Sequence, residues 1–183
     1  QWANVVLDSS GASGMLILAL TTGVMAVARF FAGPVVGKLG QTGVLLGGAI
    51  LATIGTYMFS VVTGPVAYVA AIIFALGVGY FWPVMVGAVA QRVPLSGALG
   101  MSIIGGVGMF STAIWQPIIG GWIDSARASN LAEGLTGAQL ELATGQETLL
   151  KLTMFPAILI VLFIILFIWQ KGSKPAVNAA GAH

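Results

Sequence analysis

Long apolar runs recur along this chain and restrict it to very few folds. The runs cover residues 14–36, 44–62, 66–90, 97–123 and 149–169. A helix that rises about 1.5 Å per residue can cross ~30 Å of hydrocarbon with any of them. Backbone groups that face lipid must find partners within their own segment, so the runs predict helices. Only 7% of the residues are charged, whereas soluble domains carry about 25%.

The predicted fold is therefore an all-α membrane protein, a bundle of five full transmembrane helices. The polar residues 124–145 are expected to form an outer loop or a short helix on the membrane interface. Thr144 and Glu147 fit a capping box that would start the last helix. Residues 1–10 are interpreted as the end of a truncated sixth helix, which suggests a fragment of a longer chain. Residues 171–183 are expected to be a disordered tail.

Charge orients this bundle. Lys38, Arg92 and the two C-terminal lysines follow spans that end on one side of the membrane. The acidic residues lie on the other side, in and around residues 124–145. Since basic residues mark the cytoplasmic side, the C-terminus is predicted to be cytoplasmic.

The same composition excludes several classes of function. The chain has no cysteine and a single histidine, His183, and it holds no cluster of metal ligands or nucleophile with a neighbouring base. It also lacks a run of basic residues that could neutralise phosphates, so nucleic acid is not an expected partner. We predict neither enzyme activity nor a metal or cofactor.

Arg29 interrupts the first apolar run with a charge that is never lost. Residues 14–28 are too few to span the bilayer, so the helix is predicted to continue to about Lys38. Arg29 would then lie ~13 Å inward from Lys38 and face the bundle interior or water. The predicted spans contain no acid, so an anionic ligand, a helix C-terminus or residues outside this chain would have to stabilise it. Snorkelling at a helix end and a structural ion pair are the alternatives.

The fourth span, 97–123, carries small and polar residues at four-residue spacing, which places them on one helix face. They permit either close helix packing or the wall of a polar cavity. Pro117 frees a backbone carbonyl in this span, which favours the cavity. The face and its flanks consist of Gly108, Ser111, Thr112, Trp115, Gln116, Gly120 and Asp124.

The third span, 66–90, combines helix-bending residues with aromatic ones near its middle. Gly79 and Pro83 are expected to bend the helix. Tyr80 and Trp82 lie between them, together with a phenylalanine. Such a cluster is explained by ordinary core packing or by a broken helix that presents an aromatic ring to an organic substrate.

The stretches "RFFAGPVVGKLG", "GYFWPVMVGAVAQRVP" and "QPIIGGWID" together resemble the second half of a major facilitator superfamily transporter, most of all a bacterial sugar-permease-type branch. The superfamily's loop motif G-x-x-x-D-[RK]-x-G-[RK] maps onto Gly33, Gly37, Lys38, Gly40 and Gln41. Gly37 stands where the motif has its acid, and Gln41 where it has its last basic residue.

This resemblance implies two six-helix halves that rock around a central site in the bacterial inner membrane, this chain being the C-terminal half. It implies that the second and fifth spans face lipid, that Trp82 lies near a sugar, and that a proton or sodium ion can couple transport. The candidate cavity residues are Arg29, Tyr80, Trp82, Thr112, Trp115 and Gln116.

The leading hypothesis is a secondary active transporter, or a facilitator, that moves a small polar solute such as a sugar or related metabolite. Its partners would be that solute, the N-terminal half and the lipid bilayer. The alternative is a half-sized membrane assembly module with no transport site of its own.

Overall fold

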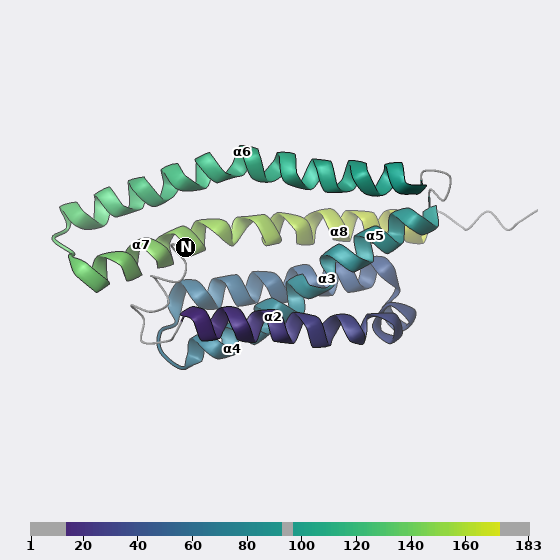
Figure 1. Ribbon diagram of the computed structural model, residues 1–183, viewed down its shortest axis with the longest axis horizontal. Coiled ribbons are helices and arrows are strands. Elements are labelled where there is room, and N and C mark those ends of the chain that lie inside the picture. Colours follow the sequence, from purple (N-terminus) through teal and green to yellow (C-terminus); the bar gives the residue numbers. More distant parts are fainter. Residues whose placement is uncertain (1–13, 93–96, 173–183) are drawn as a thin grey trace, which may run out of the picture.

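The computed structural model describes residues 14–92 and 97–172, and this part of the chain is built from helices and short turns without a strand. Figure 1 shows the helices running along one common direction as a bundle. The truncated helix expected over 1–10 and most of the expected tail lie outside the described residues. The elements are α2 (Gly14–Phe30), α3 (Ala32–Val61), α4 (Val66–Gly79), α5 (Phe81–Arg92), α6 (Gly97–Ala132), α7 (Gly137–Leu152) and α8 (Met154–Gly172).

Four continuous or nearly continuous helical stretches are long and apolar enough to cross a membrane. They are Ala32–Val61, Val66–Ala90, Gly97–Ala132 and Gly137–Trp169. The helix α2 is also apolar, but with 17 residues it is shorter than a full span. The all-helical, membrane-type fold is thus confirmed for the described residues, whereas the number of five full spans is not.

Proline explains where three of the helices stop. The helices α2, α4 and α7 end at Phe30, Gly79 and Leu152, and a proline stands four residues after each of these positions. In a continuous helix the residue at that place would donate its N–H to the terminal carbonyl, and proline has no N–H to donate. The bend predicted near Pro83 is therefore confirmed as a break between α4 and α5.

The first span is shorter in the structure than the sequence predicted. It was expected to run unbroken to residue 36, but α2 ends at Phe30. The chain then forms a short helical segment, 32–39, and turns at Gly40, whose φ of 70° is readily adopted only by glycine. The long part of α3 follows this turn and ends at Val61, one residue before the predicted end.

Of the loop and the short helix expected at 124–145, the structure has helix over most of the segment. The helix α6 continues to Ala132, and α7 begins at Gly137. The turn between them is made by Gly134 and Gly137, which both have positive φ. Thr144 does not start a helix, since it lies within α7 and the N-cap position is occupied by Thr136.

Small residues let α3 and α4 approach closely at the centre of the bundle. A side-chain carbon added at Gly48 would lie 2.7 Å from the carbonyl oxygen of Gly77, and one added at Gly77 would lie 2.4 Å from the nitrogen of Ala52. The helix α3 also packs against α5, α7 and α8. The second span was expected to face lipid, but α3 lies at the centre of the bundle. Its surface of glycine and alanine allows the other helices to pack closely around it.

The helix α6 lies along the side of the bundle (Figure 1) and packs against α7 and α5. Only Gly100 and Ala126 of its residues are buried. The last helix, α8, has no buried residue among 154–169, although it packs against α3 on one side.

Candidate functional site

Arg29 lies in the last turn of α2 and reaches the neighbouring helix α4. Its Nε donates a hydrogen bond to the carbonyl oxygen of Gly79, at 3.2 Å. One turn earlier in α2, Met25 packs on the same glycine, because a carbon added at Gly79 would lie 3.4 Å from its side chain. Two successive turns of α2 therefore contact the end of α4.

The acceptor is the terminal carbonyl of a helix, one of the three possibilities that the sequence left open. Gly79 ends α4, and Pro83 cannot donate to its carbonyl oxygen. A guanidinium at a helix C-terminus also meets the negative end of the helix dipole. The interruption of α4 and the charge of Arg29 thus compensate each other.

Gly79 also indicates how deep Arg29 lies. It is the last of the 14 residues of α4, within an apolar stretch of 25 residues, Val66–Ala90. At ~1.5 Å per residue it lies about 20 Å from Val66, near the middle of this stretch. The expected depth relative to Lys38 does not hold, because α2 ends at Phe30. The hydrogen bond to Gly79 instead places Arg29 beside the middle of the stretch.

The rest of the Arg29 side chain is accessible. The residue is exposed in this chain, and no described residue forms an ion pair with it. The two ion pairs within residues 14–92 and 97–172 join Arg127 to Glu141 and Lys151 to Glu147. Both belong to the α6–α7 hairpin region, so no carboxylate of the described residues pairs with the two terminal nitrogens of Arg29.

The two predicted aromatic residues lie directly after Gly79. Tyr80 occupies the break between α4 and α5 and packs against a core cluster of Val44, Leu45 and Val84. Trp82, in the first turn of α5, is 50% exposed. The structure therefore brings Arg29, Tyr80 and Trp82 to one helix junction, where Tyr80 has mainly a packing role and Trp82 is accessible.

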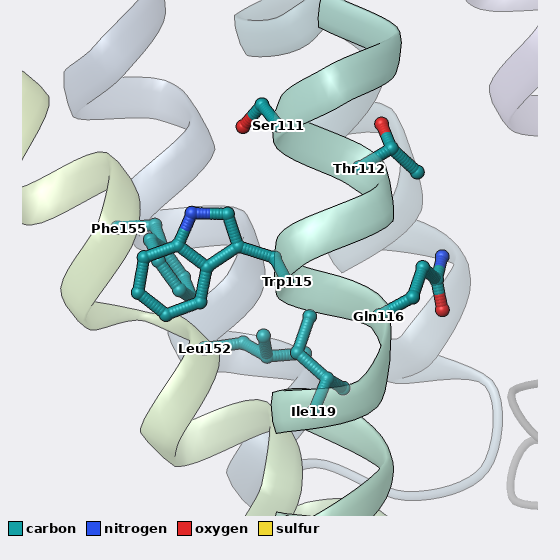
Figure 2. A pocket seen from close by; sticks show the side chains of 7 residues that line it. All are labelled: Ser111, Thr112, Trp115, Gln116, Ile119, Leu152 and Phe155. Atoms are coloured by element: carbon teal, nitrogen blue, oxygen red, sulfur yellow. The ribbon is translucent and has the colours of Figure 1, made fainter.

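The other predicted residues form a separate group on α6, beside an open groove of about 340 Å³. Figure 2 shows Ser111 and Trp115 directed toward α8, whereas Thr112 and Gln116 lie on the other side of α6. The ring of Trp115 meets Phe155 edge to face, with 4.7 Å between the centroids. The groove is lined by Ser111, Thr112, Trp115, Gln116, Ile119, Leu152 and Phe155.

The polar face of α6 has few partners among the described residues. The hydroxyl of Thr112 donates to the carbonyl oxygen of Gly108 in its own helix, at 3.0 Å. Gln116 is exposed, and a carbon added at Gly108 or Gly120 would meet nothing within 4 Å. Neither a helix–helix contact nor an enclosed cavity is formed on this face by residues 14–92 and 97–172.

The loop-motif residues lie in and after the short helical segment 32–39. Gly33, Gly37 and Lys38 are exposed, and a carbon added at either glycine would meet nothing within 4 Å. Gly40 is the motif position at which the backbone itself requires glycine.

Sequence reasoning missed two partners at these sites. Gly79 was expected to bend the helix but not to accept a bond from Arg29, although Pro83 four residues later already indicates a carbonyl without a helical donor. The ring of Trp122 stacks on Phe155 at 6.2 Å. Trp115 and Trp122 are seven residues apart, which puts both on one face of the helix. This spacing could have predicted that both rings contact the same neighbour.

Within the described residues no group of three or more potential metal ligands occurs. Comparison of the chain with protein-family models, with curated proteins and with solved structures gave no match.

Proposed function

We propose that this chain is the C-terminal half of a secondary active transporter, or of a facilitator, that moves a small polar solute across a bacterial inner membrane by alternating access. The solute is a sugar or a related metabolite. The observation that carries this proposal is the break in the middle of the apolar stretch Val66–Ala90, with Arg29 on its free carbonyl.

A break in a helix and a charge are both unfavourable inside a membrane. Where they occur together, they point to a function. Backbone that is not fully paired is tolerated at membrane depth where it is buried in protein or lines a water-filled cavity. An ionisable residue within a span points by default to a solute or ion pathway. Discontinuous helices near the membrane centre are a recurrent way in which transporters build their binding sites.

The exposed face of α6 supports the same proposal. Gly108, Thr112 and Gln116 present small and polar groups along an apolar helix, and no described helix covers them. An opposing half of the transporter, with the solute pathway between the halves, would give these groups partners. A carboxylate for a coupling proton or sodium ion would have to come from outside residues 14–123, because this part of the sequence contains no acid.

The distribution of basic residues supports the orientation. The short helical segment 32–39 and the ends of α5 and α8 lie at the same end of the bundle, opposite the α6–α7 turn (Figure 1). The positive-inside rule then favours a cytoplasmic C-terminus.

A half-sized assembly module is the second candidate, and the uncovered face of α6 favours it as well. The two candidates are separated by purifying the polypeptide that contains this chain from its native membrane and reconstituting it into phosphatidylcholine liposomes. Uptake of radiolabelled hexoses, pentoses, polyols and sugar acids is then measured with and without a proton or sodium gradient.

Saturable uptake of any of these solutes, absent from protein-free liposomes, is the expected result. A module without a transport site would give no uptake in any condition and would co-purify with a second membrane protein.

A further inference from the structure

We infer that the solute carries an anionic group, a carboxylate or a phosphate, which binds the terminal nitrogens of Arg29. This inference rests on the proposed transport function and narrows the class of solute. It begins from the way the guanidinium is held: Nε donates to Gly79, and the other two nitrogens have no hydrogen-bond partner among the described residues.

The hydrogen bond to Gly79 uses only part of the donor capacity of Arg29. A guanidinium has five N–H donors in one plane, and the bond from Nε to the Gly79 carbonyl takes one of them. The four donors on Nη1 and Nη2 have no hydrogen-bond partner among the described residues. These two nitrogens form the edge that binds a carboxylate or a phosphate through two parallel hydrogen bonds.

The hydrogen bond to Gly79 also prepares this edge for binding. It attaches the end of a long side chain to a second helix, so the orientation of the guanidinium plane is restricted before the ligand arrives. Binding to a group that is already oriented loses less conformational entropy. Lysine could not reproduce the arrangement, because a single ammonium group cannot hold Gly79 and present two parallel donors at once.

Charge determines which solutes fit. Arg29 carries a permanent positive charge beside the middle of an apolar stretch, and no described residue forms an ion pair with it. A neutral polyol would leave only the partial negative charge of the α4 end beside this full charge, whereas a carboxylate of similar size would neutralise it. A site of this kind discriminates strongly against a ligand that lacks the complementary group.

The phosphate of a membrane lipid has the same chemistry as an anionic solute. The position of Gly79 favours the solute, because this residue lies about 20 Å of helix from Val66 and not at a membrane surface. Lipid phosphates remain in the headgroup layer. The experiment below includes a separate arm for the lipid.

The test uses matched pairs of solutes in which a carboxylate replaces one terminal CH2OH group: glycerol with glycerate, erythritol with erythronate, and glucitol with gluconate. Uptake of each is measured with the natively purified polypeptide in phosphatidylcholine liposomes, for the wild type, R29K and R29Q. Thermal unfolding of wild type and R29Q in detergent, with and without phosphatidylglycerol, forms the lipid arm.

We expect at least one acid to enter at least ten times faster than its polyol, and this preference to be lost in R29Q and R29K while both variants unfold at near the wild-type temperature. Faster uptake of the polyol in every transported pair, or unchanged acid uptake in R29Q, would overturn the inference and leave the proposed transport function standing.

Stabilisation by phosphatidylglycerol that depends on Arg29, without an acid preference, would assign the guanidinium to lipid and also overturn the inference. Absence of uptake for every solute, here and in the wider sugar panel, would remove the proposed function itself.

Discussion

The Nε of Arg29 lies 3.2 Å from the carbonyl oxygen of Gly79, fifty residues further along the chain. This bond joins two features that are each unfavourable alone in a membrane, a permanent charge and a helix carbonyl deprived of its donor. Pro83 creates the acceptor, and the end of α2 brings the donor. The pair explains how an apolar bundle accommodates an arginine at this depth.

Replacing Pro83 by alanine should join α4 and α5. The new N–H can donate to the carbonyl of Gly79 and displace Arg29 from it, adding about 1 kcal/mol of local stability. Amide hydrogen exchange of residues 80–84 should then slow roughly fivefold. Pro117→Ala is the control, because α6 already continues through Pro117. Equal exchange in P83A and wild type would mean that proline is not what breaks the helix.

Gly48→Ala should destabilise the bundle, whereas Gly47→Ala should not. The added carbon at Gly48 would lie 2.7 Å from the backbone oxygen of Gly77, and at Gly47 it would meet nothing within 4 Å. Overpacking of this kind costs about 1–3 kcal/mol. Thermal unfolding in detergent, followed by circular dichroism, compares the two variants. A similar decrease for both would place the close contact between α3 and α4 elsewhere.

Thr144→Val should stabilise the protein. The Thr144 hydroxyl is buried and has no hydrogen-bond partner among the described residues, so its removal eliminates an uncompensated polar group. A gain of about 1 kcal/mol is expected. Thr148→Val is the matched control in the same helix, because Thr148 donates to the carbonyl of Thr144 at 2.8 Å. That variant should be less stable than wild type, and the opposite order would contradict the assignment.

The ion pair between Arg127 and Glu141 should contribute little. It joins α6 to α7 beyond the apolar part of the bundle, and the two side chains are 56% and 28% exposed. Exposed pairs contribute ~0.2–1 kcal/mol. A double-mutant cycle with R127A, E141A and both together measures this coupling, at low and at high salt. A coupling above about 2 kcal/mol that salt does not reduce would show that the pair is shielded from water.

Sequence patterns predicted the helical fold and several of its boundaries. The ends of α2, α4 and α7 lie four residues before Pro34, Pro83 and Pro156, whereas α6 continues through Pro117. The extension of α6 into the polar segment was missed, because hydropathy reports the environment of a helix and not its length. The central position of α3 was missed as well, since a small-residue surface allows close packing without showing which helix packs on it.

By itself, the sequence determined that the chain forms apolar helices, that Arg29 needs a compensating partner and that the third span bends near Pro83. Each of these follows from local chemistry, from apolar runs, a permanent charge and a missing N–H. Tertiary structure decided that the broken helix end at Gly79 is the partner of Arg29. It also separated Arg29 and Trp82 from Thr112 and Gln116. These outcomes depend on how helices far apart in the chain are placed in space, and helical periodicity carries no information about that placement.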